Sequence, residues 1–198
     1  MNVIDDYKLP DAELLTPSGE PQRMMVWVPD RLMVVIGNGS DALKELRADN
    51  IDADNVPVIR RGSGGCSVVL SPKMYVASFA LYGQLMKDSI GYFKKFNAVI
   101  INALESLGVD GLKHEGISDI ALNGRKIAGT ALYRNKDVVF YHAVINIAES
   151  PSLIERYLAL PPRMPDYREN RSHEDFVTSL AEQGKQVDIE DFRKALVL

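Results

Sequence analysis

The chain has 198 residues, of which 46% are hydrophobic and 25% charged, and its formal net charge is -4. This length and composition are typical of one globular domain with a well-buried core. The acidic balance argues against a partner whose phosphate backbone dominates binding, because nucleic-acid binders usually carry a basic surplus. A single cysteine, Cys66, excludes an internal disulfide and fits a reducing compartment.

The start of the chain carries no pattern of a secretory signal. The segment MNVIDDYKLPDAELL is acidic and lacks a basic region followed by an apolar stretch. Apolar runs elsewhere are a few residues long, far below the ~20 residues that span a bilayer. We therefore expect a cytoplasmic protein without a membrane or nucleic-acid partner.

The first half of the chain predicts several short strands around one short helix. Residues 1–22 are polar and interrupted by three prolines, so we expect an irregular N-terminal arm there. A helix capped by Ser40 or Asp41 is predicted over 40–47. Strands are predicted at 24–28, 32–37, 57–61 and 74–83.

The strongest helix signal spans residues 88–107. Apolar side chains recur there at spacings of three and four, and Gly108 provides the stop. A three-stranded meander should follow, because Asn123 and Gly124 favour the positive φ angles of a tight hairpin and a second turn falls at 135–137. Its strands are predicted at 117–122, 125–133 and 138–147.

Two helices are expected near the end of the chain. Ser172 should cap a helix over 172–183, and Asp188 should cap the last one, in which Phe192 lies on the apolar face. Helices and hairpins are intermixed without strict alternation. The sequence therefore predicts one α+β domain on a mostly antiparallel sheet with flanking helices.

A glycine-rich turn follows the strand predicted at 57–61, with the sequence Arg60-Arg61-Gly62-Ser63-Gly64-Gly65. Glycine lets backbone N–H groups approach an anion closely, and arginine adds charge suited to a carboxylate or phosphate. The turn matches neither a Walker-type loop nor a dinucleotide-binding loop. Its composition alone allows an anion cradle or a tight turn with exposed arginines.

A lysine among small residues stands on the strand after the Asn-Gly turn. Lys126 is followed by Ala128, Gly129 and Ala131, and Asp119 lies on the preceding strand. Small side chains leave room for a ligand beside the lysine. An edge-strand lysine kept for solubility would look the same, so this pattern alone leaves both interpretations open.

Three motifs occur in order, RRGSGGCSV at 60–68, SDIALNGRKIAGTAL at 118–132 and FYHAVINI at 140–147. They resemble the lipoate-protein ligase family of the biotin/lipoate ligase superfamily. Its corresponding segments are RRxSGGGxV, an Asn-Asp segment leading to Gly-Arg-Lys-Ile-Ser-Gly-Ser-Ala, and a His-Gly-Thr strand. The resemblance covers roughly residues 24–182, and three ordered motifs are far more specific than one.

The resemblance implies a fold and a reaction. The fold would be a catalytic domain like those of biotin ligases and class II synthetases, with a mixed sheet and flanking helices. ATP, with Mg²⁺, and a carboxylic acid such as lipoate would give an acyl-adenylate, lipoyl-AMP, and pyrophosphate. The ε-amine of a lysine on a lipoyl-domain acceptor protein would then displace AMP.

The same resemblance implies roles for individual residues. Lys126 would be the catalytic residue, holding the acyl carbonyl and a phosphate oxygen as negative charge develops. Asp119 would either bind Mg²⁺ or orient Lys126, and both roles stay open. His142 keeps the histidine of the third motif, with a structural role equally open. The residues expected to bind substrate or nucleotide are Arg60, Arg61, Ser63, Gly64, Gly65, Cys66, Asp119, Ala128, Gly129, Ala131 and His142.

Cys66 departs from the family pattern, because it replaces the third glycine of the loop. It also allows an alternative enzyme, a cysteine-dependent octanoyl or lipoyl transferase that forms a thioester. Such transferases carry their cysteine shortly before the Asp-to-Lys segment or further downstream, and 113–117 contain none. ATP-dependent ligation is therefore favoured. Biotin ligation is disfavoured because a GRGRxGR-type loop is absent, and a non-catalytic relative that binds an acyl ligand remains the third alternative.

The predicted domain organisation is an arm over 1–22 and one catalytic domain over 23–198, without a C-terminal accessory domain. Many ligases of the family carry an additional C-terminal domain needed for adenylation. Either a separate small protein would supply that function, or this chain would perform transfer alone.

Overall fold

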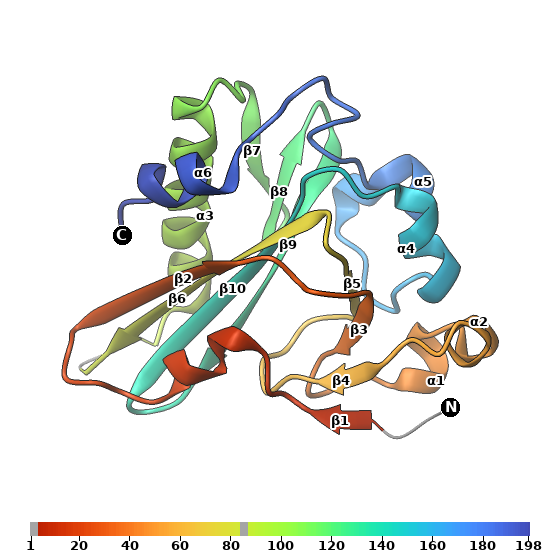
Figure 1. Ribbon diagram of the computed structural model, residues 1–198, viewed down its shortest axis with the longest axis horizontal. Helices are drawn as coiled ribbons and strands as arrows, with labels where there is room; N and C mark the ends of the chain where they lie inside the picture. Colours follow the sequence, from red (N-terminus) through yellow and green to blue (C-terminus); the bar gives the residue numbers. More distant parts are fainter. Residues whose placement is uncertain (1–3, 84–86) are drawn as a thin grey trace.

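Two β-sheets form the centre of the structure, a computed structural model that describes residues 4–83 and 87–198 (Figure 1). The larger sheet has six strands in the order β2-β6-β10-β9-β8-β7, each antiparallel to its neighbours. The smaller sheet has four strands in the order β1-β4-β3-β5, and only the pair of β3 and β5 is antiparallel. The strands are β1 (Ile4–Asp6), β2 (Gln22–Trp27), β3 (Met33–Ile36), β4 (Val58–Arg60), β5 (Val68–Leu70), β6 (Met74–Tyr82), β7 (Leu112–Glu115), β8 (Asp119–Leu122), β9 (Arg125–Arg134) and β10 (Val138–Asn146).

Helices cover the outer face of each sheet. Side chains of α3 and α6 pack on the larger sheet, and those of α1, α2 and α4 pack on the smaller one (Figure 1). The α-helices are α1 (Ala42–Glu45), α2 (Ala48–Ala53), α3 (Ser89–Ser106), α4 (Pro151–Tyr157), α5 (His173–Phe176) and α6 (Ile189–Ala195). Two short 3-10 helices are η1 (Pro10–Leu15) and η2 (Asp166–Arg168).

Helix α3 confirms the helix predicted over 88–107. Its N-cap Asp88 accepts a hydrogen bond from the backbone N–H of Gly91, and Gly108 follows its end with φ 83°. Phe96 and Ile100 are fully buried, and Phe96 packs on Tyr141 of β10 with ring centroids 4.9 Å apart. Burying each such side chain contributes about 1.5–3 kcal/mol. The helix is therefore held by its apolar face on the sheet.

The predicted meander is also present as β8, β9 and β10. Its first turn places Asn123 at φ 52° and Gly124 at φ 73°, as a tight two-residue hairpin turn requires. A register shift between Ile120 and Ala121 interrupts the pairing of β8 with β9 close to Lys126. The irregularity lies next to the candidate site, where bulges often re-aim side chains.

The single sheet that the sequence predicts is instead two sheets. The strands predicted at 24–28 and 32–37 correspond to β2 and β3, which belong to different sheets. Apolar side chains of both sheets, including Trp27 and Val35, pack together in one cluster. Periodicity reports that a strand has a buried face, and it does not report which strand pairs with it. The two sheets therefore face each other across a shared interior.

The N-terminal segment is more ordered than an irregular arm. It contributes β1, which pairs with β4, and η1, whose Asp11 is fully buried against the larger sheet. The helix predicted over 172–183 is wrong in length, because only α5 forms there. After Phe176 the chain turns to the sheet, and the N–H of Thr178 donates to the carbonyl of Lys126 at 2.9 Å. Backbone pairing thus overrides helix propensity.

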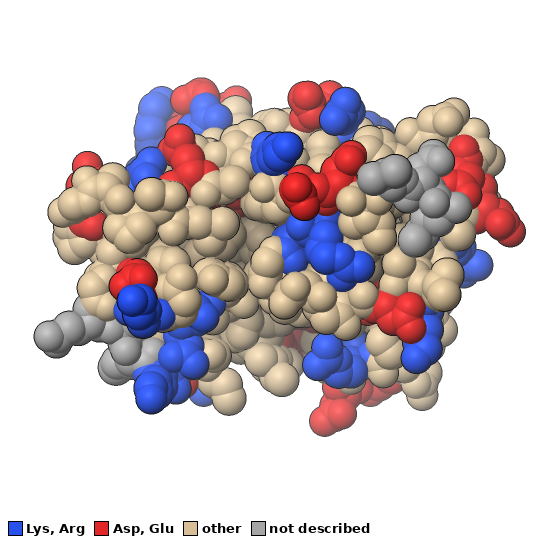
Figure 2. Space-filling model, turned by 90° about the horizontal axis from the view of Figure 1, so that it is seen from below, with Lys and Arg blue, Asp and Glu red and all other residues tan. Residues whose placement is uncertain are grey.

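Charges are dispersed over the surface seen in Figure 2. This face lies below β1 and η1 in Figure 1, and it intersperses basic and acidic side chains, with a small basic group near its centre. Among the residues that the structure describes, no helix combines the length and apolar composition needed to cross a membrane.

Candidate active site

A cavity of about 840 Å³ opens between the two sheets. Its wall combines residues of the glycine-rich turn, the β8–β9 pair and the segment that follows α4. One end is apolar, because the lining residues Leu9, Trp27, Val35, Val68, Leu70, Val76 and Val144 all belong to one packed cluster. The other end is polar and charged, with Asp119, Lys126, Arg163, Tyr167 and Arg168. A ligand with a chain-like apolar part and an anionic head would match both ends.

The glycine-rich turn is held from within by Arg61. Its side chain is only 4% exposed, and its guanidinium donates to the carbonyls of Val35 at 3.2 Å, Gly64 at 2.8 Å and Cys66 at 2.8 Å. Burial lowers the pKa of Arg61 to about 10, so it stays charged at neutral pH. Arg61 therefore lines the cavity mainly as the cation that shapes the loop.

The turn offers unpaired backbone donors. The carbonyl of Gly64 is bound by Arg61, and in a trans peptide the next N–H points the opposite way. Within the described part of the chain, the N–H groups of Gly64, Gly65 and Cys66 donate to no other residue. All three residues line the cavity. Successive free N–H groups of this kind form an anion-binding concavity.

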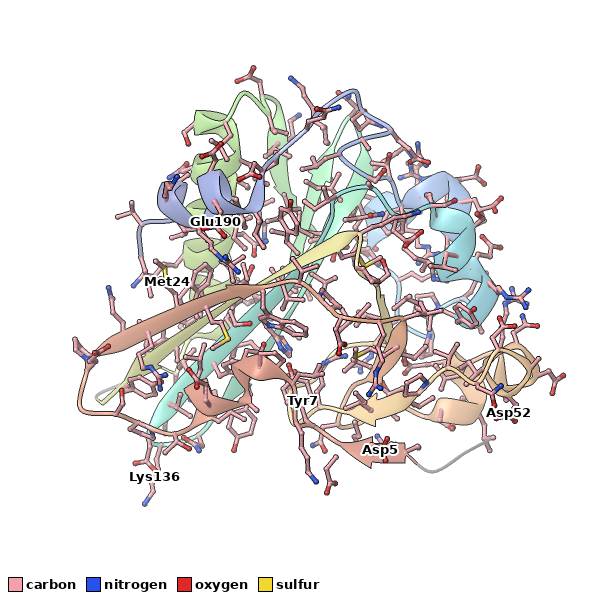
Figure 3. The ribbon with its side chains drawn as sticks, in the orientation of Figure 1. Asp5, Tyr7, Met24, Asp52, Lys136 and Glu190 are labelled. Carbon is pink, nitrogen blue, oxygen red and sulfur yellow. The ribbon has the colours of Figure 1, made fainter. Side chains whose placement is uncertain are left out.

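A buried polar network anchors the start of the turn. Ser63 Oγ lies 2.8 Å from His142 Nε2, and His142 Nδ1 lies 3.7 Å from Asp11 Oδ2. Asp11 also accepts hydrogen bonds from Tyr7 at 2.7 Å and Ser78 at 2.5 Å. Tyr7 lies between β1 and η1 (Figure 3). The network therefore ties the N-terminal segment to the glycine-rich turn across the larger sheet.

The charge state of this network follows from its burial. Burial lowers the pKa of His142, although the nearby carboxylate of Asp11 opposes that shift. Burial pushes the pKa of Asp11 upward, but the contact with His142 and hydrogen bonds from Ser78 and Tyr7 outweigh it and the net shift is downward. Asp11 is thus ionised and His142 neutral at neutral pH. A neutral imidazole can accept from one side and donate on the other.

Lys126 is fixed by an ion pair at the polar end. Its Nζ lies 2.7 Å from Asp119 Oδ1, and Tyr167 donates to Asp119 Oδ2 at 2.9 Å. The lysine side chain keeps 28% of its surface exposed. Gly129 lies beneath it, because a Cβ built there would be 3.0 Å from Lys126 Cε and 3.1 Å from Nζ. The small residue makes room for the lysine to lie along the strand.

Most of the residues expected to bind substrate come together at this cavity. Those that line it are Arg61, Gly64, Gly65, Cys66, Asp119, Lys126, Gly129, Ala131 and His142. The structure differs from the expectation for the other three. Arg60 donates to the carbonyls of residues 37, 38 and 40, Ser63 lines a neighbouring cavity of about 250 Å³, and Ala128 packs in the core beneath α3. Ala128 lies on the opposite face of β9 from Gly129 and Ala131, and its neighbours across the sheet, Ile120 and Ile145, belong to the same buried cluster.

Several lining residues lie outside the sequence motifs. Tyr167 and Arg168 belong to η2, and Arg163 lies in the segment PPRMP before it. A proline-rich stretch that contains an arginine marks a loop, and its composition does not indicate where the loop packs. Tyr7 and Leu9 come from the segment expected to be an arm. These residues could be found only from the tertiary structure.

Cys66 shows little sign of being a nucleophile. It is half-buried, and its Sγ lies 4.0 Å from the carbonyl of Arg163. Burial and the charge of Glu45 raise the pKa of its thiol, which Arg163 and then Lys126 offset only in part. Reactive cysteines have lowered pKa values, because the thiolate is the attacking form. The geometry therefore favours a lining role for Cys66.

The described side chains around Asp119 do not by themselves build a three-ligand metal site. Both oxygens of Asp119 already accept hydrogen bonds, from Lys126 and from Tyr167. Among the described residues, no three His, Cys, Asp or Glu side chains lie close enough to hold a metal ion together. Of the two roles open for Asp119, the geometry therefore favours orienting Lys126.

A buried histidine near the cavity makes stability depend on pH. His173 begins α5 and is 7% exposed. Burial, followed by the charge of Arg168, lowers its pKa from 6.5 to about 4. As the pH falls from about 6.5 to about 4, the unfolded chain takes up a proton that the folded chain does not, so stability is lost. The full loss from this group is about 3 kcal/mol.

We expect His173→Gln to remove the part of the pH dependence of stability that arises from this histidine. Denaturant unfolding at pH 7 and pH 4.5 should show the wild type losing roughly 2–3 kcal/mol more than the variant over that interval. The carboxylates lower the stability of both proteins equally over this pH interval, so their effect cancels from the difference. Equal losses in the two proteins would show that the folded state does not depress the pKa of His173.

Comparison with solved structures identifies the fold. A putative lipoate protein ligase from T. acidophilum, solved with bound lipoic acid, superposes with a TM-score of 0.76 at 20% identity, over 94% of this chain and 74% of that one. A lipoate-protein ligase A bound with ATP gives 0.75 at 21% identity, over 90% and 71%. The α+β class with flanking helices is therefore confirmed.

The sequence places the chain in a family. The model of the lipoyl protein ligase A/B catalytic domain matches residues 11–198, so the chain belongs to that family, and the resemblance carried by the three motifs is confirmed. Lipoate-protein ligase 1 of Staphylococcus aureus is 27% identical over 169 residues, 85% of this chain and 51% of the relative. Lipoate-protein ligase LplJ of Bacillus subtilis is 29% identical over 124 residues, 63% and 37%. The chain thus spans about half the length of these relatives or less.

Proposed function

We propose that this chain is the catalytic domain of a lipoate-protein ligase. It would form an acyl-adenylate from ATP and a lipoate-like acid and transfer the acyl group to a lysine of a lipoyl-domain acceptor. The observation that carries the proposal is that Lys126 and the free N–H groups of Gly64 to Cys66 line one cavity.

The cavity supports an acyl substrate with an activated carboxylate. Its apolar end would take the hydrocarbon chain, and its charged end the carboxylate and phosphate. Pockets of about 300–1,000 Å³ that combine apolar walls with a few polar groups are typical small-ligand sites. Two relatives support the ligand class, since one is described with bound lipoic acid and another with ATP.

The chemistry needs two displacements that this site can favour. In the first, a carboxylate oxygen would attack the α-phosphorus of ATP, and pyrophosphate would leave with the electrons of the broken P–O bond. In the second, the acceptor amine would attack the acyl carbon, a C–N bond would form, and AMP would leave as the amine proton passes to solvent. Both build negative charge, which Lys126 and the loop N–H groups would stabilise.

The partners follow from the same proposal. One solved relative is described as a bipartite lipoate protein ligase with its E2 lipoyl domain. By analogy, the acceptor here would be a lipoyl domain, and a separate small protein would supply an accessory function for adenylation. The acyl group is proposed to be lipoate or a similar medium-chain acid, and the compartment cytoplasmic.

Intact-mass spectrometry of an acceptor domain tests the proposal. With supplied lipoyl-AMP, a lipoyl domain should gain one lipoyl mass, and an acceptor whose target lysine is replaced by arginine should not. A second arm with ATP, Mg²⁺ and lipoate should release pyrophosphate if this chain also catalyses adenylation. Failure to transfer from lipoyl-AMP to lipoyl domains would overturn the proposal.

A further inference from the structure

Glu45, at the end of α1, is a buried acidic residue outside every motif of the sequence. It is 5% exposed, and among the described residues no Lys, Arg or His forms an ion pair with it. An ionised carboxylate in such a place must be compensated by hydrogen bonds, because burying a charge is otherwise costly. Its contacts therefore indicate what it does.

A single oxygen of Glu45 receives three donors from two loops. Oε2 accepts from Ser67 N at 2.7 Å, from Ser67 Oγ at 2.7 Å and from Ser40 Oγ at 3.0 Å. Ser40 lies in the loop after β3, and Ser67 directly follows Cys66 at the end of the glycine-rich turn. Hydrogen bonds to a charged acceptor are stronger than neutral ones. Glu45 thus joins the turn to α1.

The peptide between Cys66 and Ser67 is held from both sides. Its carbonyl accepts from Arg61 at 2.8 Å and its N–H donates to Glu45 at 2.7 Å. Because a trans peptide is planar, fixing both ends fixes the plane. The free N–H groups of Gly65 and Cys66 belong to the two preceding peptides, so we infer that Glu45 is a positioning residue that orients them toward the activated carboxylate by anchoring the end of the turn. This inference rests on the proposed function.

Charge alone would argue against a glutamate in this place. The charge of Glu45 is the second cause, after burial, that raises the pKa of the Cys66 thiol, so its field reaches the turn. A negative charge there opposes an anionic ligand. Removing it should therefore tighten binding if electrostatics dominates, and weaken binding if positioning dominates. The two explanations predict opposite signs.

The variants Glu45→Ala and Glu45→Gln separate the two explanations. The alanine variant should raise the KM for lipoyl-AMP roughly tenfold, from the loss of a charged hydrogen-bond acceptor, and leave the KM for the acceptor domain unchanged. Glutamine keeps one amide oxygen that can accept from Ser67, so it should recover most of the loss. The matched control is Glu105→Gln, an exposed glutamate of α3, which should behave as the wild type.

Hydrogen exchange of the peptide spanning 62–70 gives a readout that does not depend on activity. In Glu45→Ala the amide of Ser67, which loses its acceptor, should exchange faster, whereas Ser67→Ala keeps that backbone hydrogen bond and its protection, and α3 remains protected in both. Tighter lipoyl-AMP binding in Glu45→Ala would overturn the inference, as would unchanged exchange and KM in a folded variant. If the wild type fails to use lipoyl-AMP, the proposed function fails, and the exchange result still decides whether Glu45 holds the turn.

Discussion

Replacing Lys126 by alanine is expected to reduce acyl transfer from lipoyl-AMP by roughly 10²–10³-fold or more, the scale seen when a single donor to a developing anion is removed. The lysine is the one cation that an ion pair holds at the polar end of the cavity, among the residues the structure describes. Its loss removes charge stabilisation in both proposed displacements. Single-turnover transfer to a lipoyl domain measures the effect.

The control for this prediction is Lys136→Ala. Lys136 is exposed at the turn between β9 and β10, away from the cavity (Figure 3). The same charge is removed without touching the site, so transfer should stay at the wild-type rate. Because Asp119 loses its partner in Lys126→Ala, thermal unfolding should accompany the assay. A folded Lys126→Ala variant with wild-type transfer would show that the lysine has no part in the chemistry.

Gly37→Ala should disrupt the glycine-rich turn from a neighbouring loop. A Cβ at Gly37 would lie 2.0 Å from the carbonyl oxygen of Gly65, a separation that requires backbone to move. Overpacking of this kind costs about 1–3 kcal/mol, and the displaced turn would lose the alignment of its N–H groups. Denaturant unfolding and the KM for lipoyl-AMP should both change, the second by at least about tenfold.

Gly39→Ala is the matched control two residues further along the same loop. A Cβ at Gly39 meets nothing within 4 Å, so the substitution should leave stability within about 0.5 kcal/mol of the wild type. A wild-type KM and stability in Gly37→Ala would mean that the two loops can separate without consequence.

Local elements can be predicted from this sequence better than the pairing of its strands. The Asn123-Gly124 turn and the apolar face of α3 are local patterns, and both appear as expected. The placement of β2 and β3 in separate sheets depends on contacts between distant residues, which periodicity does not encode. The short α5 likewise ends where Thr178 pairs with Lys126. Contacts between residues distant in the sequence therefore determine the sheet to which β2 and β3 belong and the residue at which α5 ends.

Within the site, the motifs identify glycines of a tight turn and a lysine that stands among small residues on a strand. Gly64, Gly65 and Lys126 were expected at the cavity and line it. Arg60 and Ala128 were expected there and do not line it, because the first caps a loop and the second faces the core. Supporting groups such as Asp11, Tyr167 and Glu45 carry no local signal, since ordinary acidic and aromatic residues gain their importance only from what surrounds them.

The cavity wall draws on residues from Tyr7 to Phe176, and so on nearly the whole chain. No short contiguous segment contains all of the lining residues, so the complete binding surface forms only when both sheets have assembled. Occupancy of the cavity is therefore coupled to the global folding equilibrium. A ligand present at a hundred times its dissociation constant would raise the free energy of unfolding by about 2.7 kcal/mol. Both sheets would share this stabilisation, because both contribute to the cavity wall.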